Sequence, residues 1–439
     1  MSEEKSIGRQ IVQLALPSLA TLLVEPLLVL IDSAMVGHLG TDPLAGLAVA
    51  STIVTTIVGI CIFLSYATTA ATARLVGAHK PAEALRHGIE GIWLAFILGT
   101  ILALALGFGA IPVVELFNPA VSVLPHAVAY IHASAIGLPA MLVVLAATGT
   151  LRGFADTRTP LWAATSGALA NIPLNFVLIY VANLGIFGAG LGTAIAQFAI
   201  ASFLLYRLSL TARELGLPFT PSRTGVLSSL RGGIPLIIRT LCLRAAIVLQ
   251  IASATALGTT ALASNQIVMT MWNFAAFGLD ALATAAQILV GQSLGTRDVS
   301  RVREVLSVCM RWGLGIGMAT GLLFFAASWI VPVLITPDSG VSTLATHVMW
   351  IVALALPVAS LAYMLDGVLI GAGDTRALAV YMMLSLVVFA PLAVVIMTRA
   401  SSFESAGLYW LWGAYAFVFM AMRAGTMIRR VRGTDWMGI

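Results

Sequence analysis

The chain has 439 residues, of which 60% are hydrophobic and only 9% are charged. Soluble globular proteins carry roughly a quarter of charged residues, so this composition argues against a soluble enzyme. The apolar runs are long and continuous, whereas a transmembrane β-barrel would show strands of roughly 10 residues that alternate apolar and polar positions. The composition therefore predicts an all-α polytopic membrane protein.

The apolar runs predict about 12 transmembrane helices, because about 20 apolar residues are needed to span a bilayer. The first six runs lie at residues 11–36, 44–73, 88–112, 126–150, 160–182 and 186–209. The second six lie at residues 231–256, 260–292, 306–332, 341–370, 376–398 and 405–428. We expect an N-lobe at residues 1–210, a cytoplasmic linker at 211–230 and a C-lobe at 231–439.

An internal repeat relates the two halves. The segment LRGFADTR at residues 151–158 recurs as LIGAGDTR at residues 369–376, which is 218 residues later, and the same offset aligns Pro17 with Pro235. Each half has an even number of spans, so both halves enter the membrane in the same direction. The repeat predicts two parallel six-helix lobes around a central cleft, an arrangement suited to alternating access.

The positions of most basic residues indicate how the chain is oriented in the membrane. Of the 23 lysines and arginines, all except Arg239, Arg244 and Arg399 are assigned to one set of alternate loops and helix ends. Cationic loops resist translocation, so both termini are predicted to be cytoplasmic. We interpret the net charge of +5 as a record of topology and expect no nucleic-acid partner. The expected location is a bacterial or archaeal plasma (inner) membrane.

No sequence motif indicates an enzyme, a metal site or a cofactor. Cys61, Cys242 and Cys309 lie in apolar runs without the spacing of metal ligands, and a nucleotide-binding P-loop and an HExxH motif are both absent from the sequence. We therefore expect neither catalysis nor ATP-driven transport.

Polar residues inside the spans provide the functional signal. Asp32 lies on the first span, Tyr130 on the fourth, Asn171 and Asn175 on the fifth, and Thr193 on the sixth. Among the positions 218 residues later, only that of Asp32 is polar. Structural residues tend to recur in both halves, so this one-sided set indicates a specialised site.

A carboxylate within the bilayer is costly and usually marks an ion or substrate path. Asp32 is therefore predicted to be the proton- or cation-coupling residue, with the other polar residues around it. Asn171 and Asn175 are four residues apart and share a helix face. In the alternative interpretation, Asp32 is a helix-packing residue and the neighbouring groups only form hydrogen bonds between helices.

Glu25 is a second candidate acid, or a residue that only lines the cleft. It precedes Pro26 on the first span. Together with Pro17, Pro26 is predicted to bend this span, because proline removes a helical hydrogen bond.

The second half contains other charged residues at membrane depth. Asp280 is predicted either to take part in coupling or substrate binding, or to form a structural ion pair with Arg244. Arg239 is expected to extend its side chain to the cytoplasmic interface, and Asp366 to anchor a loop.

Several segments resemble the DinF-like branch of the multidrug and toxic compound extrusion (MATE) family. Residues 16–39 look like its first helix, and residues 151–160 are similar to the family's loop after span 4. Residues 239–244, 279–283 and 290–292 match the second half of that branch. The resemblance covers nearly all of the chain.

The resemblance implies a V-shaped pair of lobes and antiport of organic, often cationic, compounds against protons or sodium. It also implies an N-lobe coupling site, whose places are occupied here by Asp32, Tyr130, Asn171 and Thr193. Asn175 departs from the family pattern, because many relatives carry an acid there.

We accordingly predict a secondary active antiporter that exports amphiphilic, often cationic organic compounds in exchange for protons, with protonation of Asp32 as the coupling event. Sodium is the alternative coupling ion. The alternative function is that of a flippase for a lipid-linked precursor, which requires a basic cleft. We expect no cofactor beyond the coupling ion, and we expect a monomer in the lipid bilayer with small organic substrates as partners.

Overall fold

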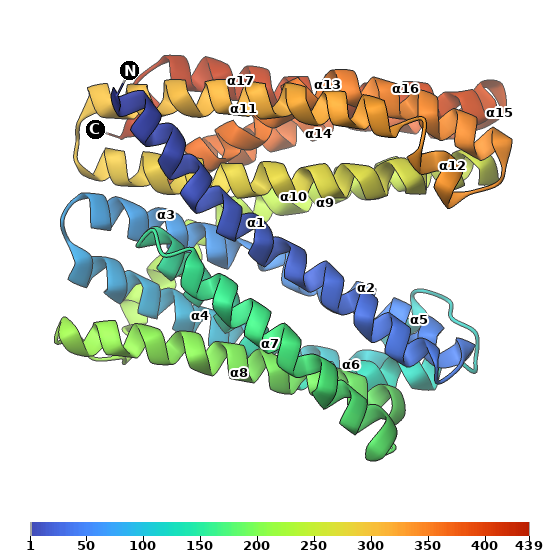
Figure 1. The fold of residues 1–439 in the computed structure, drawn as a ribbon, viewed down its shortest axis with the longest axis horizontal. Coiled ribbons are helices and arrows are strands. Elements are labelled where there is room, and N and C mark those ends of the chain that lie inside the picture. The colour runs from blue at the N-terminus through green and yellow to red at the C-terminus, as the bar shows by residue number, and fades with distance from the viewer. Residues whose placement is uncertain (1, 439) are drawn as a thin grey trace. The chain divides into compact units, whose positions relative to one another are not determined.

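The computed structural model describes residues 2–438, and these residues form helices without any strand (Figure 1). Twelve helical segments in this range are long and apolar enough to cross a membrane. The prediction of an all-α polytopic membrane protein is therefore confirmed.

The first half contains helices α1 to α8, with a π-helical segment, η1, after α7. Their bounds are α1 Ser2–Gly37, α2 Thr41–Ile60, α3 Phe63–Gly77, α4 Pro81–Phe108, α5 Ala110–Glu115, α6 Leu124–Gly153, α7 Arg158–Phe176, η1 Val177–Val181 and α8 Gly185–Glu214. Helices α2 and α3 together form the predicted second span, and α5 is a short helix between two spans.

The second half contains helices α9 to α17. Their bounds are α9 Arg223–Ala256, α10 Thr259–Gly295, α11 Val299–Ala327, α12 Val331–Ile335, α13 Ser339–Ala372, α14 Thr375–Thr398, α15 Ala400–Phe403, η2 Glu404–Ala406, α16 Gly407–Gly413, η3 Ala414–Phe419, α17 Met420–Arg432 and η4 Asp435–Met437. Only residues 215–222 separate α8 from α9, so the segment between the halves is shorter than the predicted linker at 211–230.

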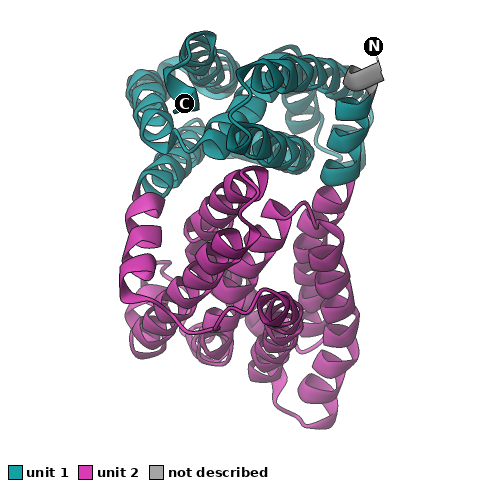
Figure 2. Ribbon diagram, turned by 90° about the vertical axis from the view of Figure 1, so that its left-hand side faces the viewer, with its two compact units in different colours: residues 1–15, 235–439 teal, residues 16–234 magenta. Residues whose placement is uncertain are grey.

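The helices form two compact units (Figure 2). Unit 2 comprises Leu16–Ile234, and unit 1 comprises Met1–Ala15 together with Pro235–Ile439. The units differ from the predicted lobes at the start of each half. Residues 1–15 belong to the unit formed mainly by the second half, and the start of α9 belongs to the unit formed by the first half. Ile7 and Ile11, at the start of α1, are fully buried in unit 1. Gly233, near the start of α9, packs in unit 2 against the ring of Phe63.

Glycines at equivalent positions of the two halves have the same structural role. Gly40 and Gly258 precede α2 and α10 with φ angles of +132° and +101°, a backbone conformation that residues with a Cβ rarely adopt. Two further repeat-related glycines allow close helix packing. A Cβ on Gly153 would lie 2.5 Å from Cβ of Thr72, and a Cβ on Gly371 would lie 2.4 Å from the carbonyl oxygen of Gln287.

The aspartates of the repeated LRGFADTR and LIGAGDTR segments form polar contacts in both halves. The Asp156 carboxylate accepts hydrogen bonds from the backbone nitrogen and the hydroxyl of Thr159, at 2.9 and 2.6 Å. Asp374 precedes α14 and binds Nε of Arg430 at 2.7 Å. The repeated segment thus has a structural role in both halves, close to where a span ends and the next begins.

Candidate ion-coupling site

The candidate site lies within unit 2, where α1, α6, α7 and α8 bring the predicted polar residues together. Asp32 of α1 is only 6% exposed. Its Oδ1 accepts a hydrogen bond from Nδ2 of Asn175 at 2.7 Å, and its Oδ2 accepts one from the Thr193 hydroxyl at 3.4 Å. Among the ion pairs of the described residues, none involves Asp32. Neutral groups therefore surround this buried carboxyl group.

The two asparagines of α7 act as one unit. Asn175 is fully buried, and its Nδ2 also donates to Oδ1 of Asn171 at 3.1 Å. The spacing of four residues on one helix produces this contact. Tyr130 of α6 is buried and lies near Thr193 and Asp32. The structure thus brings all five predicted residues into one cluster.

Gly192 of α8 is a further member of the site, and the sequence analysis missed it. A Cβ at this position would lie 1.8 Å from Oδ1 of Asn175, so only glycine leaves room for the amide. The signal was present in the alternation of Gly188, Gly190 and Gly192 along one span. Glycine lowers helix stability, so its repeated use within a helix indicates close packing.

Glu25 does not join this cluster. Its side chain is exposed, and it forms no hydrogen bond or ion pair with the other described residues of unit 2. Pro17 and Pro26 lie inside α1, which the structure defines as one helix from Ser2 to Gly37. The hydroxyl of Thr21 donates to the carbonyl of Pro17 at 2.8 Å. The roles of Glu25 as a second acid and of the prolines in bending remain predictions.

Unit 1 has a neutral cluster at the repeat-related place. Gln250, the counterpart of Asp32, is fully buried on α9 and donates through Nε2 to Oδ1 of Asn265 at 2.8 Å. The same oxygen accepts a hydrogen bond from Nε1 of Trp412 at 2.8 Å. Unit 1 therefore has the hydrogen-bonded amides of Gln250 and Asn265 at the place where unit 2 has the Asp32 carboxyl group.

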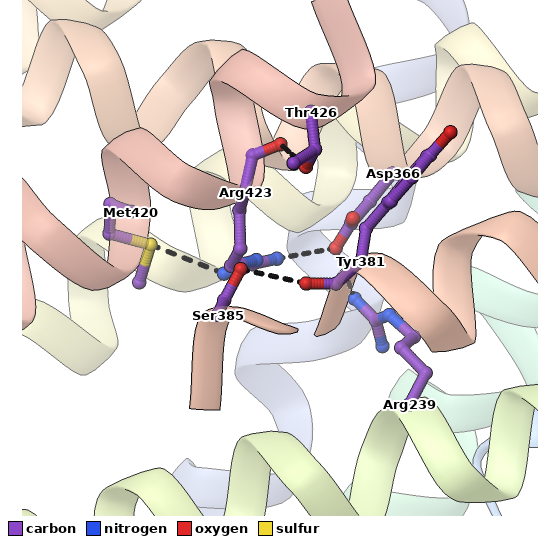
Figure 3. Close-up of polar contacts among 7 residues, drawn as sticks. All are labelled: Arg239, Asp366, Tyr381, Ser385, Met420, Arg423 and Thr426. Atoms are coloured by element: carbon purple, nitrogen blue, oxygen red, sulfur yellow. Dashed lines mark hydrogen bonds and ion pairs between the residues drawn. The ribbon is translucent and has the colours of Figure 1, made fainter. Parts of the chain in front are cut away.

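The buried acid of unit 1 is Asp366, and two arginines bind it (Figure 3). Oδ2 of Asp366 lies 2.5 Å from Nη2 of Arg239 on α9 and 2.5 Å from Nη2 of Arg423 on α17. The Arg423 guanidinium also lies 5.4 Å from the ring centre of Tyr363. Asp366 is therefore a central part of a buried charged triad.

This triad corrects three expectations. Arg239 is 4% exposed, so it does not extend to the interface, and Asp366 joins three helices instead of anchoring a loop. Arg423 is 1% exposed, although its sequence position had assigned it to the orientation signal at a helix end. The nearby Arg429, Arg430 and Arg432 concealed this difference.

Comparison with known proteins identifies the family. The MatE family model matches residues 17–177 and again residues 235–395, and the two matches are 218 residues apart. The chain belongs to the MatE family. Members of this multidrug and toxic compound extrusion (MATE) family are transporters and not enzymes. The predicted resemblance is thus confirmed, and the protein is a MATE transporter with 12 candidate membrane spans.

Relatives of this MATE transporter occur in plants and bacteria. It is 30% identical to Protein DETOXIFICATION 44, chloroplastic, of Arabidopsis thaliana over 98% of this chain and 84% of the relative. It is 29% identical to the DNA damage-inducible protein F of Escherichia coli (strain K12), over 83% of this chain and 80% of that protein. The second relative agrees with the DinF-like assignment.

The fold matches solved MATE structures. The Vibrio cholerae MATE transporter VcmN in its bent form superposes with a TM-score of 0.88 at 20% identity, covering 100% of this chain and 98% of the other. At this identity the likeness establishes the common fold.

The predicted pair of Arg244 and Asp280 is not among the ion pairs found for the described residues of this MATE transporter. Arg244 is exposed on α9, and no ion pair joins it to Asp280 among the described residues. Asp280 is half-buried on α10 and lies within electrostatic range of Tyr363. Its participation in coupling or substrate binding remains a prediction. The part of the chain that the structure describes contains no group of three or more His, Cys, Asp or Glu residues suited to a metal ion.

Proposed function

We propose that this MATE transporter is a secondary active antiporter that exports amphiphilic, often cationic organic compounds in exchange for protons, by alternating access. One observation carries the proposal. The Asp32 carboxyl group is buried within unit 2, accepts hydrogen bonds from neutral groups, and has no ion-pair partner among the described residues.

A buried carboxylate without a countercharge is unstable relative to one in water. Uptake of a proton removes the charge and also weakens the hydrogen bond from Asn175, because bonds to ionised acceptors are stronger than bonds to neutral ones. The proton thereby changes the contacts between α1 and α7. An ion can shift a conformational equilibrium only if it binds the two states with different affinity, and this change of contacts supplies such a difference.

The contrast with Asp366 supports the choice of Asp32. Two guanidinium groups compensate the Asp366 charge, so its ionised form is stable without a transported ion. The repeat-related place of Asp32 in unit 1 carries the uncharged Gln250. We therefore assign the coupling event to Asp32, and not to Asp366 or Gln250.

Sodium is the alternative coupling ion, because carboxylate, amide and hydroxyl oxygens also suit hard cations. The flippase function gains no support from a specific observation. Of the two arginines that it would use, Arg239 is buried and binds Asp366. The proposal also includes cytoplasmic termini, a monomeric state and no cofactor beyond the coupling ion.

The test is reconstitution of Asp32→Asn in proteoliposomes with a panel of fluorescent organic cations. We expect this variant to lose exchange driven by a pH gradient while it retains substrate–substrate exchange, which shows that the protein is folded. Glu115→Gln, which changes an exposed acid on α5, serves as the matched control. Intact pH-driven exchange by Asp32→Asn would overturn the proposal. If the wild-type protein responds to a sodium gradient and not to a pH gradient, the coupling ion is sodium.

A further inference from the structure

A π-helical turn begins two residues after Asn175. In η1, the backbone nitrogen of Ala182 donates to the carbonyl of Val177, five residues earlier, at 2.8 Å. A π-turn holds more residues than an α-turn and rotates the side chains that follow. Ile179 is buried in the core of unit 2, and the adjacent Tyr180 is directed to α1.

Tyr180 binds the end of the helix that carries Asp32. Its hydroxyl donates to the backbone carbonyl of Met35, at 2.5 Å. The last four carbonyls of an α-helix lack intrahelical partners, and Met35 lies among them because α1 ends at Gly37. The backbone nitrogen of His38 also donates to this carbonyl, at 3.3 Å. Tyr180 therefore caps α1 from a neighbouring helix.

Helix α8 packs closely against this π-helical turn. A Cβ on Gly188 would lie 2.7 Å from the carbonyl oxygen of Leu178, so the backbones of α8 and η1 are in close contact. The Tyr180 ring also packs on Phe176, with 5.3 Å between ring centres. The backbone and the ring of Tyr180 are therefore held by packing contacts, which fixes the position of its hydroxyl.

We propose that Tyr180 is a positioning residue for Asp32, an inference that rests on the proposed function. Helix α7 and η1 hold α1 at two points, through Asn175 on Asp32 and through Tyr180 on Met35. The first bond depends on the charge of Asp32. The second joins a phenol to a backbone carbonyl and is independent of that charge.

The two hydrogen bonds respond differently to protonation of Asp32. Protonation of Asp32 weakens the contact with Asn175 and leaves the contact between Tyr180 and Met35 in place. The end of α1 then stays attached to η1, so a rearrangement of α1 is confined to the residues before Met35.

The first test is amide hydrogen exchange of the peptide that contains His38 and Leu39, whose backbone nitrogens donate to Met35 and Val36. Tyr180→Phe keeps the ring and removes only the hydroxyl. We expect exchange in this peptide to become about five-fold faster, as for the loss of one hydrogen bond. Tyr206→Phe is the matched control, because Tyr206 is exposed on α8. Unchanged exchange in Tyr180→Phe would overturn the inference.

The second test measures transport. We expect Tyr180→Phe to retain substrate–substrate exchange and to shift the pH of half-maximal proton-driven exchange upward by roughly half a unit, because Asn175 then stabilises the ionised carboxyl group less well. A pH profile identical to that of the wild type would reduce Tyr180 to a structural role and overturn the proposal.

A third measurement needs no change at Tyr180. In Asp32→Asn, which resembles the protonated form, hydrogen exchange at residues 38–39 should equal that of the wild type, while exchange before Asp32 increases. Faster exchange at residues 38–39 would contradict the inference. The proposed function fails separately, if Asp32→Asn retains pH-driven exchange.

Discussion

Nδ2 of Asn175 lies 2.7 Å from Oδ1 of Asp32, although 143 residues separate them in the chain. The contact connects α7 to α1 through a neutral donor and an acid. It makes the packing of two helices dependent on the charge of one side chain.

Removal of the Asn175 amide should weaken coupling. A hydrogen bond to a charged group contributes about 1.5–3 kcal/mol, so we expect Asn175→Ala to reduce proton-driven exchange by roughly ten-fold or more. Asn171→Ala is the matched comparison, because Asn171 bonds to Asn175 and has no hydrogen bond to Asp32. Initial rates in proteoliposomes measure both. A larger loss in Asn171→Ala would contradict the geometry.

Gly192→Ala should displace the Asn175 amide, because the new Cβ would lie 1.8 Å from Oδ1 of Asn175. We expect a loss of proton-driven exchange similar to that of Asn175→Ala. Gly107→Ala in α4 is the control, since a Cβ there meets nothing within 4 Å.

A double-mutant cycle tests the cause of this loss. In the Asn175→Ala background there is no amide to displace, so Gly192→Ala should have little additional effect. Fully additive losses would show that Gly192 acts through another contact.

The two buried aspartates should respond in opposite ways to neutralisation. Asp366→Asn leaves the Arg239 and Arg423 guanidiniums buried without their carboxylate, so we expect destabilisation of about 3–5 kcal/mol. Asp32→Asn removes an uncompensated charge and should leave stability unchanged or increased. Thermal unfolding in detergent, followed by the loss of monodisperse protein, measures both. A stable Asp366→Asn variant would contradict the role of the triad.

Asp298 should make stability depend on pH. It lies outside the membrane spans, before α11, and its carboxylate accepts hydrogen bonds from the Ser300 hydroxyl at 2.6 Å and from the Arg301 backbone nitrogen at 3.1 Å. These bonds, that of Ser300 first, lower the pKa of Asp298. The resulting stabilisation is present above the ordinary aspartate pKa of about 3.9 and is lost as the pH falls through the lower native value.

We therefore expect Asp298→Ala to lower the melting temperature at pH 7, with a difference from the wild type that shrinks below about pH 4. Ser300→Ala removes the largest cause of the shift and should move this loss to higher pH. An equal difference at pH 3 and pH 7 would show that the charge of Asp298 has no part in the effect.

The sequence predicted much of the fold and the members of the main site. Apolar runs identify spans because the bilayer fixes their length, and the repeat identified the residues that one half lacks. Asp32, Tyr130, Asn171, Asn175 and Thr193 do meet in one cluster. Their spacing on separate spans did not specify which atoms bond.

The remaining features depend on information that a linear pattern does not contain. Tyr180 contacts α1 from a π-turn, and no sequence pattern considered for the spans indicates a π-turn. Arg423 forms a buried ion pair because α17 packs on α13, but in the sequence it stands close to a basic run that indicates orientation. Arg244 was paired with Asp280 on the basis of membrane depth, which does not determine the direction of a side chain.

The division of the chain into units has a consequence for its assembly. Residues 1–15 belong to the unit formed mainly by the second half, and the start of α9 belongs to the unit formed by the first half. Neither half of the polypeptide therefore encodes a complete folding unit. If the backbone were cut between α8 and α9, each fragment would still supply the other with its opening helical segment. We therefore expect the two fragments to associate through these exchanged segments after such a cut.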